Sequence, residues 1–492
     1  YVPTTVENAM GPSWTDPRSG EIINASVFVY HDVVKLINNW RFIQTAQTDA
    51  SVRSGKLPKE VFEDAMRYVI THEVGHCLGL MHNMSSSATI PVDSLRSPSF
   101  TQKYGTTHSI MDYARFNYVA QPGDMEKGVK LTPPRFGLYD YFTIHYSYAP
   151  LFDVKTYEEE KEIVFGWIKE AIADPVCRYG HQQMRSIIDP RSQNEDLGDN
   201  SVTASEYGTK NLKYILPKVS SWVVDDNDCT YKREIYTGII EQYLTYVKHV
   251  YANIGGIYLY EKLDGDPIEN AYSPVPVERQ KEAFDWLVKQ FNDTAWLDEP
   301  TLMEVMPIIG SPAKAMKVAL AEAIVKTPAK IMTHEQVYSK DKVWKLEDCC
   351  AEVYDLVWKP TIQGRKLTAD QMMLQREFVK TWFAAAGYTK YSGAGAGPKA
   401  DSKGITTPDF LKDYEARNAR LLNDTPNPDR QVVYGYSDPY YFFVGNLVYN
   451  HEFYDTLLKV QKLLKSRVGS ASGETKAHYE LLLHNIQKTI DK

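Results

Sequence analysis

One stretch of the chain, from Thr71 to His82, carries the pattern H-E-x-x-H-x-x-G-x-x-H. Two histidines four residues apart on a helix, His72 and His76, project from one face and suit a single tetrahedral zinc ion, to which His82 adds a third ligand. Three protein ligands leave one zinc position open, as a catalytic rather than a structural zinc site requires. Glu73 is placed to act as general base. The stretch therefore predicts a helix that carries a hydrolytic zinc site.

The residues around this motif predict where its helix begins and ends. Apolar positions continue the helical stripe that bears the two histidines, at Val61, Ala65, Tyr68 and Val69. Pro58 suits a first helical turn, and Gly79 is expected to end the helix in a left-handed conformation that turns His82 back toward the metal. Gly75 costs roughly 1 kcal/mol relative to Ala inside a helix, so we expect it to mark close packing. The alternative, a helix with ordinary surface histidines, is disfavoured because histidine is scarce, 12 of 492 residues.

A second motif, Ser109-Ile110-Met111-Asp112-Tyr113, follows the first. With it the chain resembles the metzincin clan of zinc endopeptidases, whose long zinc motif is followed by a Met-containing turn beneath the metal. The resemblance implies that Met111 lies under the histidines and that Tyr113 approaches the metal or the reaction intermediate, with simple packing as the alternative for Tyr113. Asn83, after the third histidine, matches none of the Glu, Asp, Pro or Ser residues usual there, so the resemblance implies no particular branch.

The fold class expected is α+β, with a metzincin-like catalytic module of a partial twisted sheet, the zinc helix and the Met-turn, followed by a mostly α-helical region. Residues 5–13 and 21–30 predict a hairpin. The resemblance implies that its first strand borders the cleft as the edge on which an extended substrate lies, which makes Val6, Ala9 and Gly11 candidate substrate-binding residues. A plain two-stranded ribbon is the alternative reading.

The short N-terminal segment departs from the metzincin pattern, in which several strands and a helix precede the edge strand. A two-stranded sheet is marginal alone. We therefore expect the remaining strands to come from polypeptide N-terminal to Tyr1, either deleted or present as a separate fragment of the same precursor. After the Met-turn, residues 114–122 are expected to wall the pocket for the side chain that follows the cut bond. Arg115 would favour an acidic residue there, unless it is simply a solvated surface residue.

Beyond residue 150 helical periodicity dominates. Apolar residues recur at helical spacing over 158–172, 236–254, 278–291, 312–325 and 368–386. Helix starts are signalled by Ser311 with Pro312 and by Thr368 with Gln371. We divide the chain into a catalytic module at 1–150, a mostly helical domain at 151–387, a Gly/Ala/Ser-rich linker or mobile loop at 388–404 and a C-terminal helical region at 405–492.

Two further features bear on cofactors and covalent links. The loop at residues 189–200 concentrates oxygen ligands as a Ca²⁺ site might, although its spacing does not match an EF-hand and an acidic turn is the favoured alternative. The five cysteines are odd in number, and Cys349 and Cys350 are adjacent, so they predict neither a disulfide framework nor a second zinc site. A bridge between Cys177 and Cys229 stays open.

Composition excludes some classes of partner. The net charge of −8 argues against a nucleic-acid surface, and no apolar run approaches the roughly 18 residues of a transmembrane helix. Residues 1–330 resemble large bacterial metzincin-like proteins with a helical region after the catalytic module, which implies a secreted, periplasmic or cell-surface location.

The function expected is that of an endopeptidase with one catalytic Zn²⁺ ion, acting on extracellular proteins or peptides. A protease directed at glycoproteins such as mucins is the first alternative. A non-catalytic surface binding or assembly protein with a vestigial zinc site is the second, and it is disfavoured because degeneration has no reason to spare the base.

Overall fold

The computed structural model describes residues 1–183, 187–268, 270–307, 310–337, 342–388 and 450–490. Helices dominate these residues, and the strands are few and short, so the predicted α+β class is confirmed. The expected linker at 388–404 lies, apart from Tyr388, outside the described residues, as do residues 405–449.

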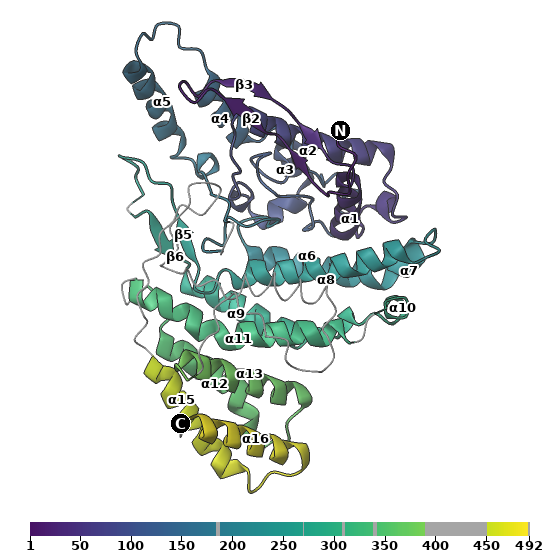
Figure 1. Cartoon of the computed structure of the whole chain (residues 1–492), viewed down its shortest axis with the longest axis vertical. Coiled ribbons are helices and arrows are strands. Elements are labelled where there is room, and N and C mark those ends of the chain that lie inside the picture. Colours follow the sequence, from purple (N-terminus) through teal and green to yellow (C-terminus); the bar gives the residue numbers. More distant parts are fainter. Residues whose placement is uncertain (184–186, 269, 308–309, 338–341, 389–449, 491–492) are drawn as a thin grey trace.

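The N-terminal segment forms a ribbon of two antiparallel arms. β1 (Ala9–Met10) pairs with β4 (Phe28–Val29), and β2 (Ser13–Thr15) pairs with β3 (Ile22–Ala25). A hydrogen bond from the Ser26 amide to the Pro12 carbonyl, 3.1 Å long, links the two pairings. Figure 1 shows this ribbon lying beside α2, the zinc-motif helix. Each sheet within the described residues has two strands.

Two helices support the predicted site from below the ribbon. α1 (Val33–Thr45) and α2 (Lys59–Cys77) pack against each other through a small core formed by Val33, Ile37, Ala65 and Phe116. α2 follows Pro58, and the chain leaves it through Gly79, whose φ is +83°. The predicted left-handed end of this helix is therefore confirmed, and it reverses the chain immediately before His82.

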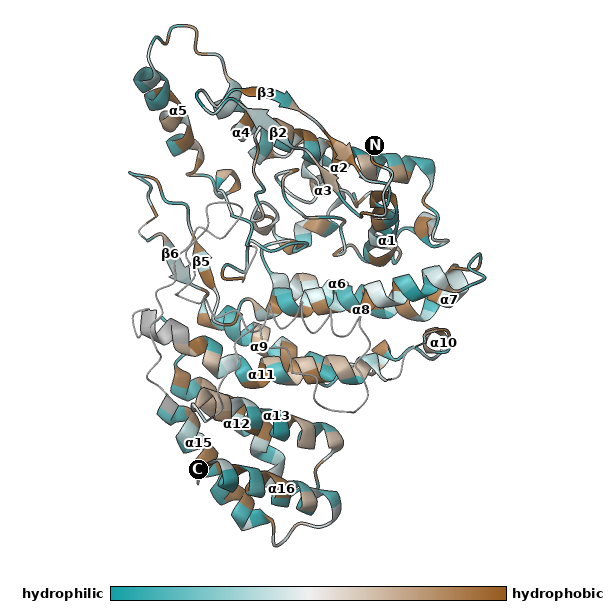
Figure 2. Ribbon diagram, viewed as in Figure 1, coloured by the Kyte–Doolittle hydropathy of each residue, from teal (hydrophilic) through white to brown (hydrophobic). Residues whose placement is uncertain are grey.

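Most of the remaining described residues form a stack of helix pairs. Figure 1 shows them layered from the zinc helix toward the C-terminus: α6 (Ser201–Ile215) with α8 (Thr230–Tyr251), α9 (Val277–Phe291) with α11 (Pro312–Val337), α12 (Leu346–Ile362) with α13 (Ala369–Ala385), and α15 (Asn450–Arg467) with α16 (Gly473–Ile490). α1 contacts α6 and α8, which attaches the N-terminal part to the first layer. One buried apolar cluster runs from Phe42 in α1 to Ile486 in α16. Figure 2 shows hydrophobic residues recurring among hydrophilic ones along these helices.

Further helices and strands lie before and between these layers. They are α3 (Pro98–Tyr104), α4 (Leu138–Tyr148), α5 (Tyr157–Ala171), α7 (Val219–Trp222), α10 (Pro300–Met303), and the pair β5 (Ile257–Leu259) and β6 (Tyr272–Pro274). α5 begins with the capping box of Thr156 and Glu159, and none of its residues is fully buried. None of the described helices combines the length and the apolar character that crossing a bilayer would require.

Sequence periodicity predicted most of the long helices but neither α6 nor α12. The buried face of α6 is made largely of small and polar residues, such as Ala204, Ser205 and Thr209, which hide its helical period. Gly208 lies in the same face, where an added Cβ would come within 2.6 Å of the Tyr246 ring. Close helix packing therefore holds α6 in place without an apolar stripe. The capping box of Thr368 and Gln371 at the start of α13 is confirmed.

Candidate active site

The three motif histidines converge on one point. The Nε2 atom of His82 lies 3.2 Å from that of His72 and 2.9 Å from that of His76. Zn–N distances of about 2.0–2.1 Å at tetrahedral angles place ligand nitrogens about 3.3 Å apart. Within the described residues this is the one group of three or more His, Cys, Asp or Glu side chains close enough to share a metal ion. The donor set fits Zn²⁺.

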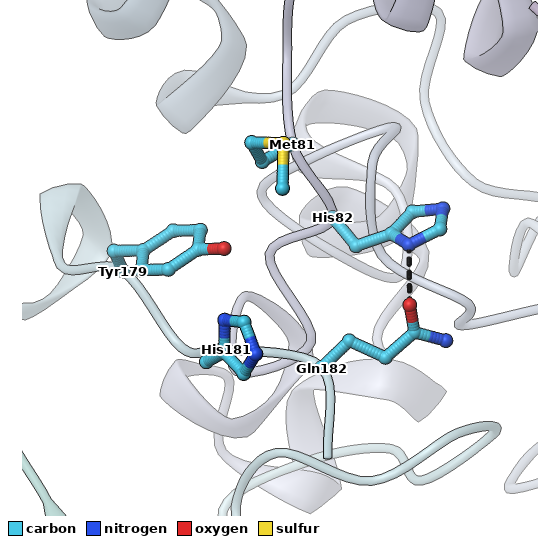
Figure 3. Close-up of a pocket in the computed structure, with 5 residues that line it drawn as sticks. All are labelled: Met81, His82, Tyr179, His181 and Gln182. Carbon is cyan, nitrogen blue, oxygen red and sulfur yellow. Dashed lines mark hydrogen bonds between the residues drawn. The ribbon is translucent and has the colours of Figure 1, made fainter. Parts of the chain in front are cut away.

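The other ring nitrogen of each histidine faces an oxygen acceptor. His72 Nδ1 lies 2.6 Å from the Ile110 carbonyl, and His76 Nδ1 lies 3.0 Å from the Leu80 carbonyl. His82 Nδ1 lies 2.7 Å from the side-chain oxygen of Gln182, the contact drawn in Figure 3. Acceptors at all three Nδ1 atoms favour the tautomer that carries its proton there, so all three Nε2 lone pairs are free to bind a metal.

Burial keeps these imidazoles neutral. Desolvation, followed by the neighbouring His76 and His82, holds the pKa of His72 well below its usual value. Desolvation also lowers the pKa of His76, and it lowers the pKa of His82 to about 4. Neutral imidazole is the form that ligates zinc, so the pocket is prepared for a cation before one arrives.

Glu73 projects from α2 toward the ribbon beside the histidines. Its side chain is buried, and burial raises the pKa of Glu73 to about 7, while Arg115 and a hydrogen bond from the Gly11 amide act in the opposite direction. A carboxylate with a pKa near neutrality is matched to accepting and returning a proton. Gly11 is pressed against the helix, since an added Cβ would lie 1.9 Å from the Glu73 carbonyl oxygen.

The Met-turn lies beneath α2 and is held by one buried carboxylate. Asp140, in the first turn of α4, accepts hydrogen bonds from Ser109 Oγ at 2.7 Å, the Ile110 amide at 2.9 Å and the Gly137 amide at 2.6 Å. Because the Ile110 carbonyl faces His72, this carboxylate anchors the turn that orients a predicted zinc ligand. Met111 is fully buried, with its sulfur against Gly75.

Tyr113 lies over the histidines. Its ring centroid is 4.5 Å from that of His82 and 5.4 Å from that of His72. The structure thus brings Tyr113, Glu73 and the three histidines together, with the half-buried Tyr113 ring packed on two of the imidazoles.

A small pocket opens on the other side of His82. Figure 3 shows its lining residues: Met81, His82, Tyr179, His181 and Gln182. Three of them come from a segment about a hundred residues beyond the zinc motif, which has no sequence pattern of its own. This segment is tied to the motif by hydrogen bonds from the Gly180 amide to Asn83 Oδ1, 2.8 Å, and from the Met84 amide to the Gly180 carbonyl, 2.9 Å. Because the segment shows no pattern in the sequence, Gln182 was not among the predicted site residues.

The candidate substrate residues lie in different settings. Val6 is exposed, Ala9 pairs with Val29 in the ribbon, and Gly11 contacts the zinc helix. The Arg115 side chain is only 18% exposed and forms an ion pair with Glu195 at 3.5 Å. It is therefore not a freely solvated surface residue.

The oxygens of the acidic loop at 189–200 are largely engaged by the protein itself. Asp189 pairs with Arg191 at 2.7 Å, Asp199 accepts from the Val92 amide at 3.1 Å, and Asn200 caps α6. All five cysteines are free thiols in the structure, so Cys177 and Cys229 are not bridged.

Comparison with known proteins points to a family. A family model described as Met-zincin covers residues 54–364, more than half of the chain. The matched range includes α2, the Met-turn, the segment that carries Gln182 and the helix layers through α12. No curated protein and no solved structure matches the chain.

Proposed function

The chain belongs to the Met-zincin family, and we propose that it is a zinc-dependent endopeptidase that cleaves extracellular proteins or peptides. The observation that carries the proposal is the convergence of three Nε2 atoms whose Nδ1 atoms each face an oxygen acceptor. A bare cluster of surface histidines would have no reason to share one tautomer. The extracellular location rests on family resemblance.

We propose that His72, His76 and His82 hold one Zn²⁺ ion. When bound, zinc would lower the pKa of a water molecule and polarise the scissile carbonyl. Glu73 takes the proton from the attacking water and returns it to the leaving amine, a double role that suits its raised pKa. Its burial next to His72 in α2 supports this role.

In this proposal Tyr113 acts as a hydrogen-bond donor, alongside the zinc ligands and Glu73. Its phenol donates a hydrogen bond to the oxyanion that develops as water adds to the carbonyl. The packing of its ring on His72 and His82 keeps the phenol at the site. The ribbon arm that contains Ala9 and Gly11 lies beside Glu73, where an extended substrate could add as a further strand.

We also propose the division of the chain into a catalytic module at 1–150 and a helical domain at 151–387, with one contact of the second range that belongs to the site. Residues 1–150 carry the histidines, Glu73 and Tyr113. Residues 151–387 supply the three helix layers from α6 to α13, and α15 and α16 form the fourth layer. Gln182, from the second range, contacts His82, so the expected catalytic module is completed by the segment that follows it.

The test pairs metal analysis with proteolysis of fluorescein-labelled casein. Full-length protein is expected to bind one equivalent of Zn²⁺, to cleave casein, to lose cleavage with a chelator and to regain it with Zn²⁺. Glu73→Gln is expected to keep zinc and to lose about 10²–10⁴-fold in kcat, the usual range for a general base. Glu63→Gln is the matched control, because Glu63 lies on the same helix and is exposed.

Two results would contradict the proposal. Undiminished proteolysis by Glu73→Gln would remove Glu73 from the chemistry, and failure of the wild-type protein to bind zinc would remove the metal.

A further inference from the structure

We propose that Arg115 is a positioning residue that holds the Tyr113 ring over the three histidines, and that Glu195 fixes Arg115 in place. The inference rests on the proposed function, because it names what orients the phenol at that same site. It gives Arg115 a different role from the selection of an acidic substrate residue that its place after the Met-turn suggested.

The first observation is an aromatic stack around the Arg115 guanidinium. Its central carbon lies 4.4 Å from the Tyr113 ring centroid and 4.0 Å from the ring centroid of Trp40, which belongs to α1. A guanidinium packed on a ring face is attracted by the ring electrons, and the attraction is stronger where water is excluded. Arg115 thus joins the Tyr113 ring to a helix of the scaffold.

The second observation is the anchor that Glu195 provides. Its carboxylate pairs with Arg115 at 3.5 Å and accepts a hydrogen bond from Gln44 Nε2 at 3.3 Å. Its amide donates to the Tyr113 carbonyl at 3.0 Å. One residue of the 189–200 loop therefore holds both the backbone of Tyr113 and the cation beside its ring.

The third observation is the backbone of the pair. Arg115 has a φ of +51° and Glu195 a φ of +66°, and in the described part of the chain only one other non-glycine residue, Cys229, has a positive φ. Residues with a Cβ adopt this region at a cost, and they cluster at functional sites, where the surroundings over-determine them. Arg115 and Glu195 are two such residues, they form an ion pair with each other, and they lie beside the histidines. This combination indicates that the surrounding structure fixes the pair for a role at the site.

The arrangement predicts an effect on kcat that passes through the Tyr113 hydroxyl, whereas the effect of Arg115 on the pKa of Glu73 is the same with or without that hydroxyl. Without the guanidinium, the Tyr113 ring loses a cation–π contact that holds it to α1 and leaves its position over His82 part of the time. We expect Arg115→Gln to lower kcat about tenfold, in line with one partly buried cation–π contact, with little change in KM. Zinc affinity should stay within about threefold, since no predicted ligand is touched.

A double-mutant cycle with Tyr113→Phe tests this route, using zinc-loaded full-length protein and labelled casein. In the Tyr113→Phe background, Arg115→Gln should change kcat by less than about twofold, because the hydroxyl it positions is gone. Arg115→Lys, which keeps the charge but not the planar stack, should recover part of the loss. Arg96→Gln is the matched control, since Arg96 also pairs with a carboxylate and lies over a tyrosine ring.

Equal losses in both backgrounds, an unchanged kcat in Arg115→Gln, or a loss of zinc affinity that accounts for the lost rate would each overturn the inference. If Arg115→Gln does not accumulate as folded protein, Glu195→Gln replaces it in the cycle, with the same two-background comparison.

A crystal structure of metal-free Arg115→Gln separates this inference from the proposed function. If the wild-type protein proves to have no peptidase activity, the proposed function fails, and the position of the Tyr113 ring still decides the inference. Displacement of the ring from the 4.5 Å centroid separation with His82 supports it, and a ring that remains there overturns it.

Discussion

Gly75 in the zinc helix packs against Met111 in the turn beneath it, and the Met111 sulfur occupies the space that a side chain at position 75 would need. A Cβ on Gly75 would lie 2.4 Å from the sulfur of Met111, a distance that real Cβ atoms do not tolerate. Met111 is fully buried, so its sulfur has little room to move aside. Gly75 therefore lies at a point of close packing. The sequence predicted this, because glycine is unfavourable inside a helix relative to alanine.

Gly75→Ala should destabilise the protein although alanine is the better helix former. Propensity alone would favour Ala by roughly 1 kcal/mol, but overpacking a filled core costs about 1–3 kcal/mol. We expect a net loss of about 1 kcal/mol in the free energy of unfolding, measured by urea titration. Gly166→Ala in α5 is the control, because nothing lies within 4 Å of its added Cβ, and it should stabilise slightly. Equal stabilisation by both substitutions would refute the contact.

Gln182→Leu should weaken zinc binding. Its side-chain oxygen is the acceptor for His82 Nδ1, and loss of such a partner typically costs 10–100-fold in metal affinity. Gln182→Glu retains an acceptor and should bind zinc at least as tightly as Gln182→Leu. Competition with a chromophoric chelator measures the affinities. Gln102→Leu, which loses only a hydrogen bond to the Gly128 carbonyl, should leave them unchanged.

Gly11→Ala should impair catalysis without loss of metal. The added methyl group would meet the Glu73 carbonyl at 1.9 Å, so the ribbon arm must move away from α2 and take with it the amide that bonds the Glu73 carboxylate. We expect kcat/KM on casein to fall about tenfold or more, as for other small displacements of catalytic groups. Zinc stoichiometry is the parallel measurement, and Gly469→Ala, in open space, is the control. Full activity in Gly11→Ala would contradict this contact.

Asp112 should contribute a stability that decreases as pH rises toward 7, and Asp112→Asn should remove this contribution from the pH dependence of unfolding. Burial raises the pKa of Asp112 from 3.8 to about 7, although Ser87 and Thr107 donate hydrogen bonds to its carboxyl. A carboxyl whose folded pKa is raised contributes stability that is complete below its unfolded pKa and is lost as pH rises through about 7. Urea unfolding at four pH values measures the slope. Asp225→Asn, at an exposed site, should not alter it.

Much of the site's local geometry could be predicted, because it depends on residues close together in the chain. The four-residue spacing of His72 and His76 places both on one face of any helix, and Gly79 supplies the reversal that returns His82 to them. The start of α13 followed from Thr368 and Gln371 for the same reason. Where a buried face lacked large apolar residues, as in α6, the periodic signal vanished and the helix was missed.

The sequence alone determined which residues form the candidate zinc site, since one motif contains all three histidines and Glu73. Only the tertiary structure decided what orients them: Gln182 on His82, Asp140 under the Met-turn, Gly11 against Glu73, and Glu195 on Arg115. These partners lie tens of residues or more away along the chain, and no periodic pattern marks them. They become neighbours only when the helix layers and the ribbon close around α2, because side-chain contacts of this kind are set by packing rather than by local conformation.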